Sequence, residues 1–366
     1  MKLHKIKPSN FKKTIICRNV SSTLVNKSIK RTHLPKAGDV AIFRIKEVGK
    51  HTRVQTVNGN NRYILPGDLI MATFGNRYAT EQLEGYLPTE YCTNYQILGQ
   101  GGVIGTMASI HSKFELVGPT TVSLVGYVVD ETGQVINTKY LNHEAPLELI
   151  SPSKTQAPKV ILSLGTGMDS GKTTSAAFLT RGLKLAKKKV AYIKLTGTAY
   201  TKDRAMVRDY GAKMSLDFSD FGFPSTYMCS TRELLILYKY LFDKAKSIAP
   251  DVIVVEIADG LLQRETSALL NDSVFAQNVF GVLFSATDSM SAISGANMLK
   301  ELNYNVIGVT GLFTTSPLMV DEVRNASDYK VLLGDELMSK EIIDTLEQSK
   351  KTEVFENKMA ANNGIC

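Results

Sequence analysis

One stretch of this chain, residues 159–179, constrains its fold more than any other. It begins with the apolar run 160–164, which is typical of a buried strand, and then passes through Gly165, Gly167 and Gly171 into a helix-like pattern. Glycines let the backbone turn tightly and point its N–H groups toward one spot, and the positive end of the following helix adds to that cradle. The stretch predicts a loop that binds phosphate.

The residues after Gly171 are those that a Walker A motif requires. Lys172 can reach the outer phosphates and the Thr173 hydroxyl can hold Mg²⁺. The motif is slightly altered, because Thr166 replaces the first glycine of G-x-x-x-x-G-K-[ST]. A glycine-rich turn without a ligand is the alternative. The residues expected to contact nucleotide phosphates are Thr166, Gly167, Asp169, Ser170, Gly171, Lys172, Thr173 and Thr174.

Length and composition indicate an ordinary globular protein of two domains. The chain has 366 residues, which exceeds one average domain. No apolar run approaches the ~20 residues that cross a bilayer, and the N-terminus lacks the apolar core of a secretory signal. We therefore expect a cytoplasmic protein without a membrane partner. The four cysteines are widely scattered, which favours neither a disulfide framework nor a zinc site.

The positive charge of the chain belongs to its N-terminal segment. Residues 1–36 hold ten Lys and Arg and no Asp or Glu, which leaves 33 basic and 35 acidic residues in the rest. Such a segment could bind nucleic acid or another anionic surface. An arm that packs on its own acidic protein is an equal alternative, and an organellar transit peptide is a third.

The pattern beyond this segment indicates two kinds of domain. Short apolar runs with Asn-Gly and Pro-Gly-Asp turns fill 37–150 and predict an all-β barrel or sandwich. The polar, proline-containing stretch 151–158 is typical of a linker. Strand-like and helix-length segments then alternate over 159–350, which predicts an α/β domain whose mainly parallel sheet is covered by helices on both faces. Residues 351–366 are expected to form a tail.

The segment 75–85 within the expected β-domain is more polar and aromatic than a connector requires. It reads Gly-Asn-Arg-Tyr-Ala-Thr-Glu-Gln-Leu-Glu-Gly. It could line a ligand site, and a capped loop with Tyr78 in the core is the alternative.

Charged side chains follow two further strands of the expected parallel sheet. Lys194 ends the apolar run 190–193, and Glu256 ends a β-branched run, as the acid of a Walker B strand does. Because ligands sit beyond the carboxyl ends of such strands, we expect both residues near the phosphate loop. Lys194 could hold an anionic substrate or a transferring phosphoryl group, unless it merely extends from the edge into water. Asp259 could orient a nucleophile or bind metal through water, although Ala-Asp-Gly is also a plausible turn.

Two more carboxylates follow Lys194. Asp203 and Asp209 lie six residues apart on a helix-like segment, so both can face one side, but only one is expected to reach a metal. We favour Asp203, which is nearer the strand end, and a surface salt bridge with Arg204 or Arg208 is the alternative. The predicted metal ligands are Thr173, Glu256 and Asp203.

These motifs resemble a known class of proteins over residues 160–335. The loop 165–173 is similar to the G-T-x-x-x-x-G-K-T loop of the dethiobiotin synthetase-like branch of SIMIBI-class P-loop NTPases. Residues 190–197 resemble the second strand of that branch, and 255–262 resemble its V-E-x-A-x-G-L-L strand end. The resemblance implies a lysine on substrate at Lys194 and a glutamate on Mg²⁺ at Glu256.

The whole chain also resembles a bacterial protein family with an N-terminal β-domain. The shared phrases lie at 75–78, 217–226 and 258–266, and they imply no activity. The chain lacks the N-K-x-D motif by which GTPases of the class resemble one another, so ATP is favoured over GTP. It also lacks the early loop lysine of the dimerising partitioning ATPases, so their mode of action is not expected, although a homodimer stays open.

Two classes of function remain. The first is a Mg²⁺- and ATP-dependent enzyme, ligase-like or phosphoryl-transferring, that acts on a small anionic substrate through Lys172, Lys194, Glu256 and Asp259. The second is a nucleotide-dependent switch whose β-domain and basic N-terminal segment bind a macromolecule such as nucleic acid. A handling protein for an anionic cofactor is a third possibility that rests on fold analogy alone.

Overall fold

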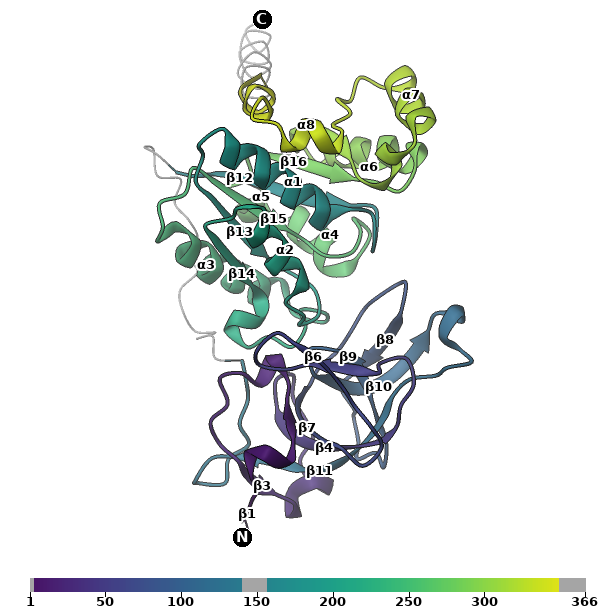
Figure 1. Ribbon diagram of the computed structural model, residues 1–366, viewed down its shortest axis with the longest axis vertical. Helices are drawn as coiled ribbons and strands as arrows, with labels where there is room; N and C mark the ends of the chain where they lie inside the picture. The colour runs from purple at the N-terminus through teal and green to yellow at the C-terminus, as the bar shows by residue number, and fades with distance from the viewer. Residues whose placement is uncertain (1–2, 140–156, 349–366) are drawn as a thin grey trace, which may run out of the picture. The chain divides into compact units, whose positions relative to one another are not determined.

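The computed structural model describes residues 3–139 and 157–348, which divide into two compact units (Figure 1). The β-rich unit contains the described residues up to 139 together with Thr196–Lys202 and Asp217–Leu237, and the α/β unit contains the rest. Most of the expected linker 151–158 and all of the expected tail 351–366 lie outside the described residues.

The β-rich unit is built on a nine-stranded sheet that closes into a barrel. Its strands are β1 (Leu3–Lys5), β2 (Lys12–Lys13), β3 (Leu24–Asn26), β4 (Val40–Glu47), β7 (Leu69–Phe74), β8 (Leu83–Tyr86), β9 (Tyr95–Gly99), β10 (Val103–Ile110) and β11 (Thr121–Val129), and β5 (Arg53–Gln55) pairs separately with β6 (Asn61–Tyr63). The pairs run from β11 through β4, β7, β10 and β9 back to β11. All of them are antiparallel except β7 with β10. Of the two expected all-β forms, the pairing is that of a barrel.

Aromatic rings fill the interior of this barrel. Phe74 contacts Phe43, Tyr95 and Tyr127, with ring centroids 5.2, 5.4 and 5.8 Å away. Phe43, Phe74, Tyr95 and Tyr127 are all almost fully buried. Edge-to-face and tilted ring pairs of this kind add about 0.5–1.5 kcal/mol each to the burial of apolar surface. Phe43 alternates with Ala41 and Ile45 along β4, and Phe74 with Ile70 and Ala72 along β7, and all of these residues belong to one buried apolar cluster, as expected for the inner face.

The basic N-terminal segment is part of the same unit. Strand β3 pairs with β11, β1 pairs with β3, and β2 pairs with β7. Two of its basic residues form ion pairs within the unit: Lys12 with Asp68, and Arg18 with Asp220 at 2.9 Å. The described part of the segment is therefore folded against the barrel.

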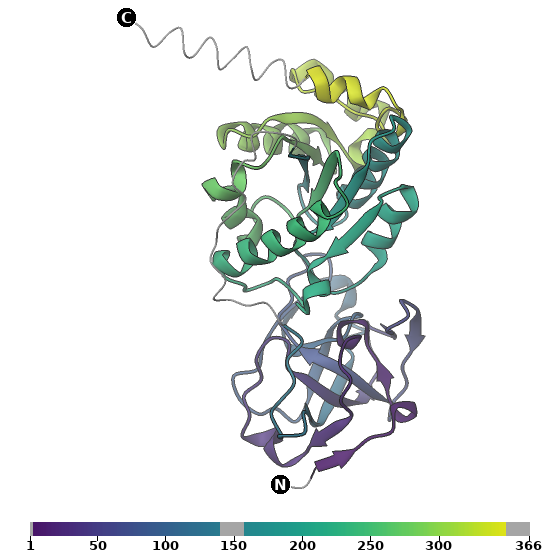
Figure 2. The ribbon, with the colours of Figure 1, turned by 90° about the vertical axis from the view of Figure 1, so that its left-hand side faces the viewer.

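The α/β unit, drawn mainly in teal, green and yellow in Figure 2, contains a six-stranded sheet. The order of its strands is β14-β13-β15-β12-β16-β17. The strands are β12 (Lys159–Gly165), β13 (Val190–Lys194), β14 (Met214–Asp217), β15 (Val252–Glu256), β16 (Gly281–Ser285) and β17 (Val306–Thr310), and the helices are α1 (Lys172–Leu185), α2 (Lys202–Tyr210), α3 (Thr231–Lys246), α4 (Arg264–Leu270), α5 (Ser273–Ala276), α6 (Ser289–Glu301), α7 (Pro317–Ala326) and α8 (Gly334–Met338). Neighbours from β13 to β17 pair in parallel.

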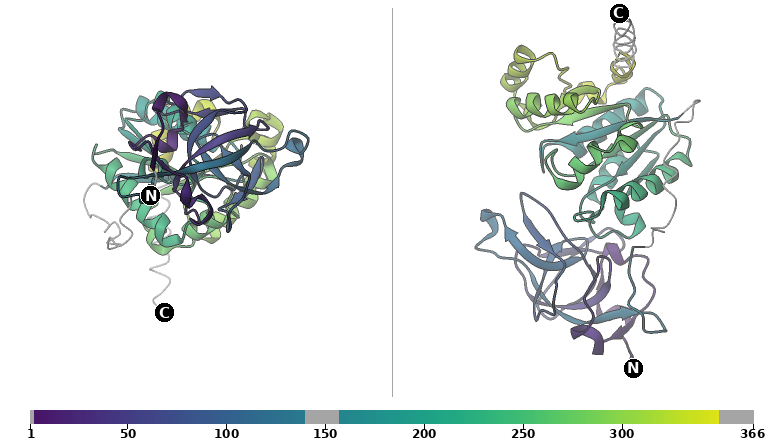
Figure 3. Two further views of the ribbon diagram at one scale, coloured as in Figure 1. Left: turned by 90° about the horizontal axis from the view of Figure 1, so that it is seen from below. Right: turned by 180° about the vertical axis from the view of Figure 1, so that it is seen from behind.

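Helices lie on both faces of this sheet, as the sequence predicts (Figure 3). One face carries Ile161, Tyr192 and Val254, which pack with Leu179 and Leu183 of α1 in a buried apolar cluster. The apolar run at 331–333 joins the sheet only by a single bridge from Val331 to Val309, because the chain turns away into α8. No helix in the described ranges combines the length and the apolar character that crossing a bilayer requires.

The contact between α1 and α8 has no room for a side chain at Gly182. A Cβ atom there would overlap the carbonyl oxygens of Leu337 and Ser339. Helix propensity alone favours alanine over glycine by about 1 kcal/mol. Backbone oxygens cannot rotate away, so Gly182→Ala should instead lower the free energy of unfolding by about 1–3 kcal/mol in chemical denaturation. The exposed neighbour Arg181 is the control, and Arg181→Ala should change that free energy by less than about 0.5 kcal/mol. A stabilised Gly182→Ala protein would contradict the packing described.

Candidate functional site

The predicted phosphate loop connects the end of β12 to the start of α1. Gly171 precedes the helix with a φ of 101°, a left-handed conformation that glycine adopts without strain. The amide of Thr166 donates to the carbonyl of Ser285 at 3.0 Å, and the carbonyl of Ser170 accepts from the amide of Leu312 at 3.1 Å. The loop is thus hydrogen-bonded to the segments that end β16 and follow β17.

Two glycines outside the loop allow backbone to approach it closely. A Cβ atom on Gly260, which follows β15, would overlap the carbonyl oxygen of Thr166. A Cβ atom on Gly311, which follows β17, would overlap the carbonyl oxygen of Ser170. Sequence analysis did not identify either residue, although both stand just beyond an apolar strand, where a glycine indicates close backbone approach. The loop conformation therefore depends on three neighbouring strand ends.

Lys172 is buried and turned toward the loop. Its Nζ atom donates to the carbonyl of Gly167 at 2.5 Å and lies 3.4 Å from Oγ of Ser170. Burial lowers the pKa of Lys172, and the carboxylates of Glu256 and Asp259 act in the opposite direction. The ammonium group therefore lies in the cradle that the sequence predicts for phosphate.

Glu256 is the centre of the remaining polar side chains. Its strand pairs in parallel with β13 so that Glu256 lies beside Lys194 in register. Its Oε1 atom accepts from Oγ1 of Thr173 at 2.9 Å and from Nζ of Lys194 at 3.2 Å. Its Oε2 atom accepts from the hydroxyl of Tyr192 at 2.8 Å. The carboxylate is only 1% exposed, so these donors replace water around it.

Lys194 joins Glu256 to Asp203. Its Nζ atom is hydrogen-bonded to Oδ2 of Asp203 as well as to Glu256. Burial alone would lower the pKa of Lys194, but the two carboxylates outweigh it and raise that pKa well above the ordinary value. Asp203 thus reaches this cluster through a lysine, whereas Asp209 is exposed.

The oxygens present fit a magnesium ion that also binds phosphate. Thr173 Oγ1 and Glu256 Oε1 are adjacent hard ligands, and Mg²⁺ usually takes only one or two protein oxygens besides phosphates and water. Asp203, the third predicted ligand, is bonded to Lys194 instead. Within residues 3–139 and 157–348, no group of three or more His, Cys, Asp or Glu side chains could hold a metal by itself.

The other predicted residues lie around Lys172. Asp259 and Asp169 are near enough for their charges to raise the pKa of Lys172. Both have positive φ, 62° and 61°, which aspartate tolerates better than most residues. Asp259 is half-buried, whereas Asp169 and Thr174 are exposed. The structure therefore brings together the residues named for phosphate, metal and catalysis, while their roles stay predictions.

Two residues that bond to the candidate site escaped sequence analysis. Tyr192 donates to Glu256, and the hydroxyl of Ser163 donates to the carbonyl of Lys172 at 3.0 Å. Strand periodicity could have identified Tyr192, because it stands two residues before Lys194 and so on the same face. Ser163 is the polar residue of an otherwise apolar run and pairs in register with Glu256.

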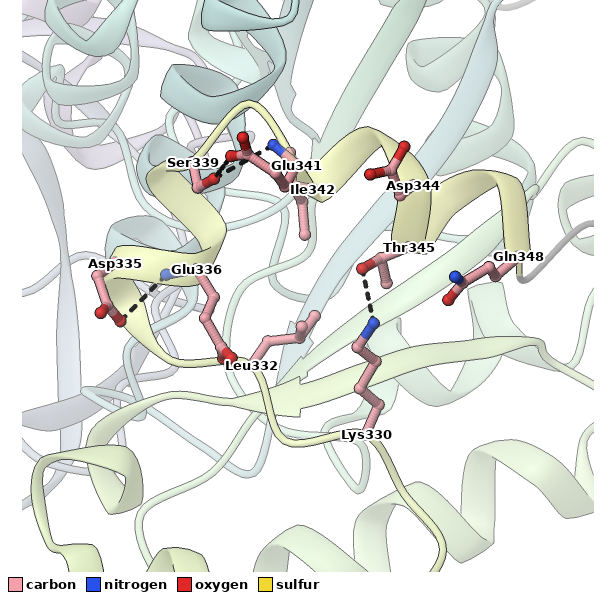
Figure 4. A pocket seen from close by; sticks show the side chains of 10 residues that line it. All are labelled: Lys330, Leu332, Asp335, Glu336, Ser339, Glu341, Ile342, Asp344, Thr345 and Gln348. Carbon is pink, nitrogen blue, oxygen red and sulfur yellow. Dashed lines mark hydrogen bonds between the residues drawn. The ribbon is translucent and has the colours of Figure 1, made fainter.

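A separate cavity of about 390 Å³ lies beside α8 in the α/β unit (Figure 4). Its walls carry the acidic side chains of Asp335, Glu336, Glu341 and Asp344, and the ammonium of Lys330 bonds to Thr345 at 2.8 Å. None of the predicted site residues lines it. An acidic wall repels phosphate, so this cavity does not compete with the P-loop as a nucleotide site.

Comparison with known proteins concerns the fold alone. No protein-family model and no curated protein matches the chain. Among solved structures it is similar to the signal recognition particle receptor FtsY of Elizabethkingia anophelis in complex with GDP (18% identity, TM-score 0.36, 54% of this chain and 66% of that one). It is also similar to the signal recognition particle 54 kDa protein of Aeropyrum pernix K1 in complex with GDP (15%, TM-score 0.35, 59% and 54%). The chain thus spans less than two thirds of the length of either structure.

The nucleotide in these structures differs from the one that the sequence favours. The expected preference for ATP over GTP is wrong, since the nucleotide in both of these structures is GDP. The absence of one guanine-reading motif provides no contact to adenine, and the loop residues named above are expected to contact phosphates, which ATP and GTP share.

The hydrogen bond from Tyr192 to Glu256 can be tested by its effect on stability. Tyr192→Phe removes one donor from a buried carboxylate, which should lower the free energy of unfolding by about 1–3 kcal/mol. The control is Tyr329→Phe, because that hydroxyl bonds to Asn297 at the surface, where water can replace it. The control should change stability by less than about 0.5 kcal/mol. Equal effects of the two changes in denaturant unfolding would show that the buried carboxylate does not depend on Tyr192.

Proposed function

We propose that the α/β unit binds a nucleoside triphosphate with Mg²⁺ and cleaves its terminal phosphoryl group. The observation that supports this is the meeting of Lys172, Thr173, Lys194 and Glu256 at one edge of a parallel sheet, beside a glycine-rich loop. Such an edge is where ligands bind in open α/β sheets.

Each of these side chains has a separate task in that reaction. The loop amides and Lys172 bind the β- and γ-phosphates, and Thr173 with Glu256 holds the metal. When bound, Mg²⁺ neutralises negative charge that develops on the phosphates. Asp259, whose charge acts on Lys172, would orient the nucleophile.

Lys194 is the residue we assign to the acceptor. It carries a fixed positive charge, because Asp203 and Glu256 keep it protonated. A cation beside the γ-phosphate can hold a small anionic substrate in place for phosphoryl transfer, ligase fashion, or stabilise the transition state when water is the acceptor. The proposal thus includes the class of acceptor, which is a small anionic substrate or water.

Lys172→Ala tests this site. Loss of a preorganised cation on the transferring group should reduce triphosphate hydrolysis by at least about 100-fold and weaken binding. Turnover should be measured with GTP first and with ATP for comparison, each with and without Mg²⁺. The matched control is Lys300→Ala, an exposed lysine of α6 in the same unit, which should keep wild-type rates. Unchanged hydrolysis in Lys172→Ala would remove the P-loop from the reaction.

A nucleotide-dependent switch is the second candidate, and one observation favours it. Thr196–Lys202, which follows Lys194 in the chain, belongs to the β-rich unit. Within that unit the amide of Thr201 donates to Gln55 at 3.0 Å, and the hydroxyl of Tyr200 accepts from Asn61 at 2.9 Å. A change at Lys194 on nucleotide binding would therefore be passed along the chain to the barrel. A macromolecule such as nucleic acid would be the partner.

Hydrogen exchange distinguishes the two candidates. A switch should alter amide protection at 196–202 and at β5 and β6 when nucleotide binds, because these segments are hydrogen-bonded to one another. The Lys172→Ala protein should show no such change. Protection that stays constant in the barrel while the P-loop becomes protected would favour the enzyme without a switch.

A further inference from the structure

The β-rich unit contains a group of basic side chains that the proposed function does not use. Lys50 and His51 follow β4, and Arg77 belongs to the polar segment 75–85 noted in the sequence. We call these three residues the Lys50 cluster. Far apart in sequence, they meet beside β9. The guanidinium of Arg77 donates to the carbonyl of Leu98, and Thr120, whose carbonyl accepts from the amide of Ile97, donates its hydroxyl to the carbonyl of His51.

The nitrogen atoms of the Lys50 cluster converge on one another. Nε2 of His51 lies 3.4 Å from Nζ of Lys50 and 3.4 Å from an Nη atom of Arg77. Both cations also donate to one uncharged atom, Oε1 of Gln82, with the Arg77 contact at 2.8 Å. Arg77 further donates to the carbonyl of Leu98. The two cations therefore share two uncharged partners, the amide oxygen of Gln82 and the ring nitrogen Nε2 of His51.

The cluster is shielded from water on one side and reaches the surface on the other. His51 is 2% and Arg77 8% exposed. Lys50 is half-buried, with its ammonium 4.9 Å from the ring centroid of Phe114. Lys113 places a further cation 5.5 Å from the same ring; its side chain is 46% exposed and pairs with Glu81 at 2.7 Å. The cluster thus reaches the surface through Lys50.

The charges of the cluster repel one another. Burial lowers the pKa of Lys50 to about 8, and the positive charges of Arg77 and Lys113 contribute. Burial, Arg77 and Lys50 likewise hold the pKa of His51 well below its usual value. Among the residues that the structure describes, Lys50 forms no ion pair with a carboxylate. Like charges that lie close together in a partly buried position destabilise a fold, and binding sites often contain such charges.

We propose that the Lys50 cluster is a binding site for an oxyanion, the phosphoryl or carboxylate group of a small ligand. An ammonium has three donors and a guanidinium five, so an anionic oxygen can join or replace Gln82 between Lys50 and Arg77. The neutral His51 ring lies at the same point and completes the wall. This site is independent of the P-loop and does not rest on the proposed nucleotide reaction.

Nuclear magnetic resonance of the histidine rings in the full-length protein tests the site locally. The chain has five histidines, so the ring signal of His51 can be resolved and followed. Inorganic phosphate and acetate, each titrated to ~10 mM, are the probes, since millimolar affinity is enough to saturate the shift at that concentration. We expect at least one anion to move the His51 signal to a plateau, and the stronger one identifies the group preferred. The Lys172→Ala protein should respond in the same way, which separates this site from the P-loop.

Matched variants decide whether the shift comes from the cluster. Lys50→Gln should weaken the anion affinity at least 10-fold, and Lys50→Arg should retain it. Lys46→Gln, which removes an exposed lysine of β4, should leave the affinity unchanged. The proposal is overturned if neither anion moves the His51 signal of the wild-type protein, or if Lys50→Gln responds as the wild type does.

Discussion

A carboxylate that water does not reach holds the α/β site together. Removing a charged group from water carries a penalty of several kcal/mol unless other groups bond to it. Glu256 meets this requirement with the hydroxyls of Thr173 and Tyr192 and with the ammonium of Lys194. These donors come from α1 and β13, so the need to satisfy one buried charge fixes the start of the helix against the strand ends. The same oxygens that a metal would use are thereby already in place.

A second constraint is steric and acts on the backbone. The phosphate loop can keep its shape only because Gly260 and Gly311 let neighbouring segments contact its carbonyl oxygens. Hydrogen bonds act beside these close approaches: the amide of Thr166 donates to Ser285, and the carbonyl of Ser170 accepts from Leu312. The loop is thus held by neighbouring segments of the protein, which favours a preorganised site.

Much of this arrangement was predictable because it follows local rules. The glycine pattern at 165–171 predicts the loop, and the rule that parallel strands share one carboxyl edge predicts that Lys194 and Glu256 meet. Closure of the barrel through β9 was not predictable, since it depends on pairing between strands distant in sequence. The hydrogen bond from Tyr192 to Glu256 was missed because Tyr192 lies in an apolar run, where a tyrosine is usually taken for a core residue. The preference for ATP failed because it rested on the absence of a guanine-reading motif, and that absence shows no contact with adenine.

Two lysines of this chain show how neighbours decide the state of a buried cation. Burial disfavours the charged form of both Lys194 and Lys50. Two carboxylates reverse that effect at Lys194, whereas Arg77 and Lys113 add to it at Lys50, whose pKa falls to about 8. Lys194 is therefore a permanent charge that suits the positioning of a reacting anion. An anion bound beside Lys50, as proposed, would raise the pKa of Lys50 again, so ligand binding at the barrel would take up a proton at a pH near or above 8.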